Sequence, residues 1–413
     1  MQTQLAPQYQ NTPEGQEAEA ILRKCVHCGF CNATCPTYQL LGDELDGPRG
    51  RIYLIKQVLE GSTPTRSTQL HLDRCLTCRN CETTCPSGVQ YGQLVDIGRK
   101  VVEAQVERPR EERLVRRALT SGLTSPVFGP AMKLGQWMRP LLPEVLRDKV
   151  PAAHPPRAAL WPTRRHERRV LLLVGCVQPA IMPNINSATA RVLDEIGIQS
   201  LVADEAGCCG ALRTHLNDHA GGLADMRRNV DAWWPLVSQR RIEAIVMNAS
   251  GCGVTVREYG RYLAHDPPYA ERARRISDLT RDISELLPEI VPRLRSRLRP
   301  RPGKLTYHAP CTLQHGQQLQ GSVEPHLREL GLEITTAPQE NHLCCGSAGT
   351  YSVLQPDLAR ALRDRKLEHI APLAPQTIIS SNIGCIQHLQ SGTRTPVRHW
   401  IEVLDEALAS AGS

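Results

Sequence analysis

The spacing of apolar positions predicts helices in the first part of the chain and alternating strands and helices in the second. Residues 48–60 place apolar side chains on one helix face, at Ile52, Ile55, Val58 and Leu59. Another helix is expected to begin at Thr12-Pro13, because proline suits the first helical position. Further helical text lies at residues 111–119. The first part is therefore predicted to be helical.

Short apolar runs in the second part predict strands. Residues 170–174 and 304–307 form two such runs, and each run ends just before a cysteine. A helical stretch, a terminating glycine and another strand follow in both cases. After the first run, the predicted helix is 187–196, the glycine is Gly197 and the strand is 198–202. After the second run, the helix is 323–330, the glycine is Gly331 and the strand is 332–336. Later strands at 244–247 and 377–380 continue a β-α-β alternation, which predicts parallel sheets covered by helices.

The sixteen cysteines repeat in a way that supports this division. Eight precede residue 90 as two runs of four, and eight follow residue 170 as two groups with an adjacent pair in the middle. Equivalent cysteines of the two later groups lie 133 to 136 residues apart, which indicates a duplicated unit.

We therefore predict an α+β multidomain protein, in which a helical domain that carries the first two cysteine runs precedes two α/β repeats with parallel sheets. The expected boundaries are 1–100 for this first domain, 101–168 for a helical and Pro/Arg-rich connector, and 169–300 and 301–413 for the repeats.

Composition and charge narrow the functional classes. The 413 residues carry a formal net charge of +7, and 4% of them are aromatic. Nucleic-acid binders of this size concentrate more basic charge, and single-strand binders need aromatic stacking platforms. No apolar stretch approaches the roughly 20 residues of a membrane-spanning helix, and the N-terminal text lacks the pattern of a secretory signal. We expect a cytoplasmic protein that binds no nucleic acid.

The first two cysteine runs have the bacterial ferredoxin spacing C-x2-C-x2-C-x3-C-P. Three thiolates of a tight loop reach three corners of one [4Fe–4S] cluster, while the fourth, at a helix start, ligates the other cluster in two-cluster ferredoxins. One predicted ligand set is Cys25, Cys28, Cys31 and Cys85. The other is Cys75, Cys78, Cys81 and Cys35.

Zinc is the alternative occupant of these runs, because C-x2-C pairs also occur in zinc knuckles. The third cysteine at the same spacing and the Cys-Pro ending do not belong to zinc-finger spacing. We therefore predict that residues 1–100 form a helical ferredoxin-like domain with two [4Fe–4S] clusters. His27 lies inside the first loop. We expect it not to be a ligand, because four cysteines suffice.

The later cysteines follow predicted strand ends, where ligand chemistry gathers in parallel sheets. The two groups are Cys176, Cys208, Cys209 and Cys252, and Cys311, Cys344, Cys345 and Cys385. Four thiolates suit a further Fe–S cluster or a zinc ion, while free thiols and a strained vicinal disulfide are the alternatives. The glycine after each adjacent pair permits positive φ and close backbone approach. His308, His315 and His342 flank the second group, and we expect them to lie outside the ligand set.

The motifs together resemble the family of glycolate oxidase iron–sulfur subunits, within a wider group of proteins with cysteine-rich CCG domains. The resemblance covers nearly the whole chain. Its matching text is CVHCGFCNATCPTYQLLGDELDGPRGRIYLIKQVLEG from Cys25, LDRCLTCRNCETTCPSGVQY from Leu72, EAGCCGA from Glu205, NASGCG from Asn248, CTLQH from Cys311, HLCCGSAGTY from His342 and NIGCIQHL from Asn382.

The resemblance implies the electron-transfer subunit of a flavin-dependent complex that converts glycolate to glyoxylate. The chain has no G-x-G-x-x-G at a strand-to-helix turn and no P-loop. We therefore expect no flavin, no nucleotide and no catalytic residue on it, and a flavoprotein subunit as its partner. Electrons are expected to continue to a respiratory quinone, with the chain peripheral on the inner face of the cytoplasmic membrane.

One departure bears on the alternatives. Heterodisulfide reductase, in the same wider group, ends each CCG unit in C-x2-C, whereas Ala249 and Asn382 replace the first of these cysteines here. The absence of this cysteine from both units counts against the alternative that the chain is an enzyme that reduces disulfides. Lactate or glycerol 3-phosphate as electron donor, and a zinc scaffold in the second half, are further alternatives.

Overall fold

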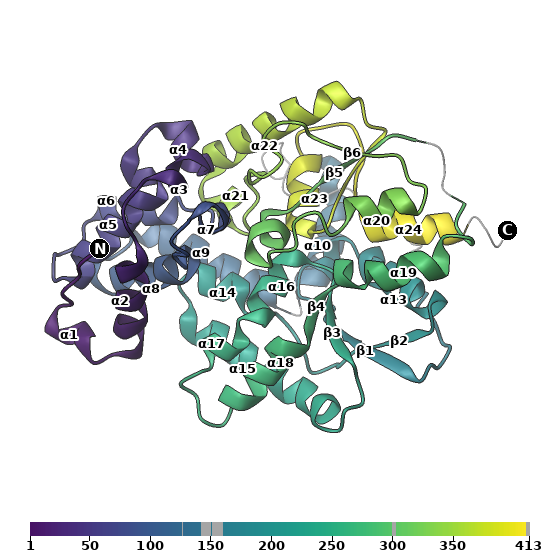
Figure 1. The fold of residues 1–413 in the computed structure, drawn as a ribbon, viewed down its shortest axis with the longest axis horizontal. Coiled ribbons are helices and arrows are strands. Elements are labelled where there is room, and N and C mark those ends of the chain that lie inside the picture. Colours follow the sequence, from purple (N-terminus) through teal and green to yellow (C-terminus); the bar gives the residue numbers. More distant parts are fainter. Residues whose placement is uncertain (126, 142–149, 151–159, 300–302, 410–413) are drawn as a thin grey trace.

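A group of short helices wraps the first two cysteine runs (Figure 1). The structure is a computed structural model that describes residues 1–125, 127–141, 150, 160–299 and 303–409. The helices of this part are α1 Pro7–Gln10, α2 Pro13–Lys24, α3 Phe30–Ala33, α4 Pro36–Leu41, η1 Glu44–Asp46, α5 Pro48–Leu59, α6 Arg66–Asp73, α7 Asn80–Thr84 and α8 Tyr91–Gln105.

The predicted helices of the first part are confirmed. Helix α5 covers the apolar pattern at 48–60, and α2 begins at Pro13 with the Thr12 hydroxyl accepting a hydrogen bond from the Gly15 amide at 3.1 Å. Leu22, Leu59 and Leu94 are fully buried where α2, α5 and α8 meet. Removal of such side chains from water, worth about 1.5–3 kcal/mol each, stabilises the helical part.

Helices also connect the first part to the sheets. They are α9 Arg110–Thr124, α10 Phe128–Met138 and η2 Arg139–Leu141. Helix α9 covers the helical text at 111–119, whereas part of the predicted Pro/Arg-rich segment lies outside the described residues. None of the described helices is long and apolar enough to cross a lipid bilayer.

Two four-stranded parallel sheets with the same topology form the second part (Figure 1), which confirms the predicted fold class. The first has strand order β2-β1-β3-β4 and the second β6-β5-β7-β8. The first repeat comprises β1 Arg168–Leu172, α12 Gln178–Ile181, α13 Asn184–Glu195, β2 Ile198–Leu201, α14 Ala211–His215, α15 His219–Ser238, β3 Ala244–Met247, α16 Ser250–Arg257, α17 Tyr259–Tyr262, α18 Ala270–Leu279, β4 Thr280–Asp282, η4 Ile283–Leu286 and α19 Leu287–Leu294.

The second repeat follows the same plan with shorter connections. It comprises β5 Leu305–His308, the π-helix η5 Thr312–Gly316, α20 Glu324–Glu329, β6 Ile334–Thr336, α21 Tyr351–Leu354, α22 Pro356–Ile370, η6 Ala371–Leu373, β7 Thr377–Ser380, α23 Ile383–Gln390, β8 Val397–His399 and α24 Trp400–Ala409. One apolar core contains Val246 of the first sheet and Ile379 of the second, so the repeats pack as one body.

The last residue of the fourth strand in each repeat contacts the other repeat through its side chain. Asp282, the last residue of β4, accepts a hydrogen bond from the Gln317 amide of the second repeat at 3.3 Å. His399, the last residue of β8, contacts the Asn248 carbonyl oxygen of the first repeat at 3.0 Å. These buried contacts join the two carboxyl edges, at which the later cysteines lie.

Candidate iron–sulfur and thiol centres

Both ferredoxin-type loops have the same unusual backbone. The second residue after the first cysteine has positive φ in each, 61° at His27 and 52° at Thr77. The fourth has φ 85° at Gly29 and 59° at Arg79, immediately before α3 and α7. Left-handed backbone at non-glycine residues is strained and collects at functional sites. The repeated strain indicates that both loops are shaped around the same kind of group.

The first set of thiols comes together from both runs. Cys25, Cys28, Cys31 and Cys85 line one small cavity, and Cys81 of the second run also reaches it. Burial and the neighbouring thiols of Cys25, Cys85 and Cys28 raise the pKa of Cys31 to about 11. A group of mutually repelling thiolates is favourable where a cationic iron core neutralises it.

The second set is also drawn from both runs. Burial raises the pKa of the Cys78 thiol well above its usual range, and the neighbouring Cys311, Cys35 and Cys75 thiols add to the effect. Burial and the thiols of Cys78, Cys75 and Cys35 act in the same way on Cys81. Cys35 therefore lies with the second run, as the crossed arrangement requires, and Cys311 of the second repeat lies beside them.

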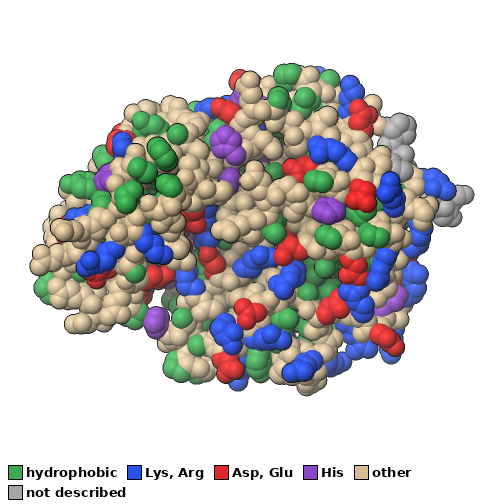
Figure 2. Space-filling model, in the orientation of Figure 1, with side chains coloured by type: hydrophobic (Ala, Val, Ile, Leu, Met, Phe, Trp, Pro, Cys, Tyr) green, Lys and Arg blue, Asp and Glu red, His purple; other side chains and the backbone are tan. Residues whose placement is uncertain are grey.

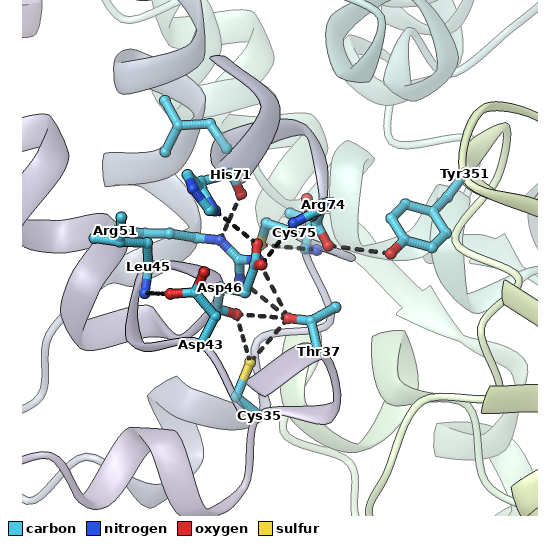
Figure 3. A network of polar contacts seen from close by, with 12 residues as sticks. Cys35, Thr37, Asp43, Leu45, Asp46, Arg51, His71, Arg74, Cys75 and Tyr351 are labelled. Atoms are coloured by element: carbon cyan, nitrogen blue, oxygen red, sulfur yellow. Dashed lines mark hydrogen bonds and ion pairs between the residues drawn. The ribbon is translucent and has the colours of Figure 1, made fainter. Parts of the chain in front are cut away.

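A buried ionic network fixes the loops of this second set (Figure 3). Asp46 is fully buried and contacts Arg51 at 3.3 Å, Arg74 at 2.8 Å and His71 at 3.1 Å. The Cys35 thiol lies 3.3 Å from the Thr37 hydroxyl, which donates to the Asp46 carbonyl oxygen at 2.8 Å. This network was not predicted from the sequence, although all of its charged residues lie in the segment between the two cysteine runs.

Arginine charges favour the thiolate form in the second set. Burial opposes ionisation of Cys75, but Arg51 and Arg99 outweigh it and lower the pKa of this thiol. Arg99 also donates to the Leu72 carbonyl oxygen at 2.8 Å and to that of Cys75 at 2.6 Å. Thiolates with cationic neighbours suit an iron–sulfur cluster, because thiolate is its usual protein ligand.

The cysteines of the first repeat form a chain of neighbouring thiols. Cys208 is within hydrogen-bonding reach of both Cys176 and Cys209, and Cys209 is within reach of Cys252. Hydrogen bonds from Cys176 and Cys209, aided by the Gly210 amide at 3.4 Å, lower the pKa of the Cys208 thiol. Cys176 follows β1, the adjacent pair follows β2, and Cys252 lies on α16 after β3.

The second repeat has the same arrangement. The Cys311 and Cys344 sulfurs are 3.7 Å apart, Cys345 is within hydrogen-bonding reach of Cys344 and Cys385, and Cys385 accepts from the Asn382 amide at 3.6 Å. None of the sixteen cysteines, all of which lie in the described residues, forms a disulfide, and this includes the two adjacent pairs.

The glycine after each adjacent pair is required by the backbone. Gly210 has φ 90° and Gly346 has φ 89°. A β-carbon at Gly210 would lie 2.8 Å from the Gly222 carbonyl oxygen, and one at Gly346 would lie 2.5 Å from that of Ala359. The expected close approach is confirmed in both repeats.

A cavity of about 970 Å³ joins the second ferredoxin-type loop to both repeats. Apolar side chains such as Leu119, Leu212 and Ile383 form much of its wall. The cysteines that line it come from three parts of the chain: Cys75, Cys78, Cys176, Cys208, Cys209, Cys252, Cys311, Cys344 and Cys385. Sequence reasoning placed these groups in separate domains and did not predict that they share one space.

Direct contacts hold this arrangement together. The Arg79 guanidinium donates to both carboxylate oxygens of Glu258 on α17's N-terminal side, at 2.5 and 2.8 Å. The Thr83 hydroxyl lies 3.0 Å from His315 Nδ1, and His315 Nε2 lies 2.9 Å from the His342 carbonyl oxygen. His315 is thus occupied by hydrogen bonds that join the second loop to the second repeat.

These sites define a class of protein, namely iron–sulfur proteins in which a two-cluster ferredoxin-type domain precedes duplicated cysteine-rich domains. The sequence matches the 4Fe-4S dicluster domain over residues 21–89, and the Cysteine-rich domain over residues 170–257 and 305–390. The chain belongs to the family of glycolate oxidase iron–sulfur subunits.

Full-length relatives support this assignment. The chain is 55% identical over 410 residues to the glycolate oxidase iron-sulfur subunit of Escherichia coli (strain K12), covering 99% of both chains. It is 30% identical to the probable glycolate oxidase iron-sulfur subunit of Bacillus subtilis (strain 168), over 93% of this chain and 92% of the relative. Lactate utilization protein A of Geobacillus thermodenitrificans (strain NG80-2) is 26% identical over 57% of this chain and 98% of its own length.

Proposed function

We propose that the chain is the electron-transfer subunit of a complex that oxidises glycolate to glyoxylate. The position of the second ferredoxin-type set supports this most strongly. That set adjoins the first set on one side and the cavity of about 970 Å³ on the other. Iron–sulfur clusters at the two sets would supply one-electron transfer through the first part of the molecule.

The proposed ligands follow the groups that the fold brings together. Cys25, Cys28, Cys31 and Cys85 hold one [4Fe–4S] cluster, and Cys35, Cys75, Cys78 and Cys81 hold the other. The fit rests on four thiols per set, on the strained loops, and on Arg51 and Arg99 beside Cys75.

Electrons are proposed to enter at the first set from a flavoprotein partner. Cys28 is exposed there, beside Val26 and Phe30, whose exposed fractions are 68% and 61%. Figure 2 shows apolar side chains gathered over the region of α3 and α4. Exposed apolar side chains of this size are typical of an interaction site, and proximity to the cluster favours a redox partner.

Electrons are proposed to leave through the shared cavity to a respiratory quinone. Leu119 and Leu123 of α9 and Arg139 of η2 line this cavity. The same connector exposes Trp137 and Leu141 by 78% and 81%. Exposed tryptophan and leucine beside basic residues favour the lipid–water interface. They support peripheral attachment to the cytoplasmic face of the membrane, with the cavity open to a lipid-soluble acceptor.

The test is anaerobic reduction of the purified complex by substrate. Glycolate should bleach the flavin of the partner and then produce the electron paramagnetic resonance (EPR) spectrum of reduced [4Fe–4S] clusters on this chain. Lactate and glycerol 3-phosphate, added in parallel, should reduce the clusters at least tenfold more slowly. Bleached flavin with clusters that stay oxidised would refute the electron-transfer role. Faster reduction of the clusters by lactate than by glycolate would show that glycolate is not the preferred substrate.

Two matched double variants separate the proposed surfaces. Val26→Asp with Phe30→Asp should reduce co-purification of the flavoprotein at least tenfold, while the iron content and membrane sedimentation are retained. Leu134, which is also exposed on α10, belongs to the second surface, and Leu134→Asp with Trp137→Asp should release the complex from membranes while the flavoprotein stays bound. Equal effects of both variants on both readouts would contradict the assignment of the two surfaces.

A further inference from the structure

His308 is a buried imidazole without a hydrogen-bond partner. It is the last residue of β5 and is 1% exposed, and neither of its ring nitrogens has a partner. Buried polar atoms are nearly always satisfied in folded proteins. Coordination of a metal ion would give one of the two ring nitrogens a partner, because that nitrogen then donates its lone pair to the ion.

Two thiols face this imidazole. A ring nitrogen of His308 and the sulfurs of Cys345 and Cys385 all lie within 4.8 Å of one another, and all three residues are buried. Zinc binds sulfur at about 2.3 Å and nitrogen at about 2.0–2.1 Å in a tetrahedron, which places neighbouring donors about 3.5–3.8 Å apart. The observed group is therefore compact enough to close on one ion.

This compactness distinguishes the group from the other cysteine sets. Among the described residues, no three cysteines of the ferredoxin-type sets or of the first repeat lie so close together. Wider spacing suits the larger core of a [4Fe–4S] cluster. The other compact group of possible ligands, Asp43, Asp46 and His71, is not comparable, because Arg51 and Arg74 already neutralise Asp46.

The first repeat has a leucine, Leu173, at the position equivalent to His308. Leu173 precedes Cys176 by three residues, as His308 precedes Cys311. Leu173 is buried and packs in an apolar cluster with Cys209, while Cys252 contacts that cluster. The duplicated scaffold thus presents two thiols with a leucine in one repeat and two thiols with an imidazole in the other.

We propose that the second repeat binds one zinc ion through His308, Cys345 and Cys385, with Cys344 in the fourth position. Cys344 is within hydrogen-bonding reach of Cys345 but lies outside the compact group, so its sulfur has to move toward the other three donors to complete the tetrahedron. Three thiolates around Zn²⁺ leave one net negative charge, and the amino group of the buried Lys366 is the basic group beside Cys345 and Cys344. The site is structural and rests on side-chain geometry, so it is independent of the proposed substrate.

The experiment is metal analysis of the full-length protein, purified anaerobically, with zinc and iron counted per chain. Wild type should contain about one zinc. His308→Leu, which copies the first repeat, should lose at least nine-tenths of it with the iron unchanged. His342→Leu, in the loop before Cys344, is the histidine control and should keep its zinc. Absence of zinc from wild type, equal zinc in His308→Leu, or loss of about four irons in that variant would overturn the proposal.

A second variant keeps the test informative if His308→Leu does not fold. His308→Cys replaces the imidazole with a thiolate and should retain zinc. X-ray absorption at the zinc edge should then change from three sulfurs and one nitrogen to four sulfurs. An unchanged nitrogen contribution would overturn the role of His308. The proposed electron transfer is read separately, since glycolate-dependent cluster reduction can succeed or fail whatever the zinc content is.

Discussion

The two CCG repeats have the same parallel topology and equivalent cysteines, yet the surroundings of those cysteines differ. In the first repeat Leu173 packs near Cys209. The buried side-chain amides of Gln178, Asn186 and Asn248 form hydrogen bonds with one another at 2.8–2.9 Å. In the second, His308 replaces the leucine and Cys311 lies beside Cys78 of the ferredoxin-type part. A duplicated scaffold can therefore keep thiol positions while neighbouring residues decide what the thiols bind.

The largest expected effect concerns the glycines that both repeats require. Gly346→Ala places a methyl group 2.5 Å from a carbonyl oxygen at φ 89°, and Gly210→Ala places one 2.8 Å from another at φ 90°. We expect each to lower the free energy of unfolding by about 2–4 kcal/mol, with Gly346→Ala the more severe. Chemical denaturation measures the loss.

Gly349→Ala is the matched control for both glycines. Gly349 has φ 62°, but a β-carbon there meets nothing within 4 Å. Its replacement should cost only about 1 kcal/mol, from backbone strain alone. Equal losses at Gly349 and Gly346 would show that close backbone approach contributes nothing, and that the two repeats do not need the glycine for packing.

A smaller effect, of opposite sign in the two repeats, is expected from pH. Burial raises the pKa of Asp282 to about 6, and burial lowers the pKa of His399 to about 3. The folded state holds a proton on Asp282 that the unfolded state releases, so stability falls as pH rises from about 4 to 6. The unfolded state protonates His399 below about 6.5 and the folded state does not, so stability falls as pH decreases.

Two variants separate these contributions. Between pH 5 and 6, wild type relative to Asp282→Asn should lose up to about 1.4 kcal/mol per pH unit as pH rises, and wild type relative to His399→Gln should gain a similar amount. Denaturation midpoints across this range measure both slopes. Slopes of the same sign would contradict the burial of two neutral groups at equivalent strand ends.

The smallest expected effect is a gain of function in the first repeat. Leu173→His should recreate the imidazole beside Cys209 and Cys252 and raise zinc from about one toward two per chain. Leu173→Met, of similar volume and without an imidazole, is the control. No additional zinc in Leu173→His would show that the position alone does not distinguish the repeats.

The sequence predicted those features that depend on short-range pattern. The strands at 244–247 and 377–380 coincide with β3 and β7, because their apolar residues are buried and bounded by turns. Gly197 and Gly331 have φ 79° and 87° at the helix ends, as predicted. The fourth strands were missed, because β4 and β8 are three residues long and alternate with charged side chains.

The site was predictable only where ligand spacing is local. The two ferredoxin-type runs can be recognised from the spacing of their cysteines alone. The proximity of Cys78 to Cys311, in contrast, depends on packing between residues far apart in the sequence. The expectation that His308 lies outside a ligand set stays a prediction. The structure places its imidazole, which has no hydrogen-bond partner, near the Cys345 and Cys385 thiols, and this proximity could not be predicted from the sequence. The domain boundary at residue 100 stays a prediction, and helix α8 runs across it.

We propose that each cysteine run supplies its fourth cysteine to the cluster of the other run, so that two [4Fe–4S] clusters lie side by side. It is tested most directly by iron and sulfide counts on two double variants, purified anaerobically beside wild type. Cys28→Ala with Cys35→Ala removes one ligand from each proposed cluster, so about eight irons should be lost. Cys28→Ala with Cys85→Ala removes two ligands from the same cluster, so about four should be lost. The reverse order of losses, or wild type with zinc in place of iron, would contradict the account.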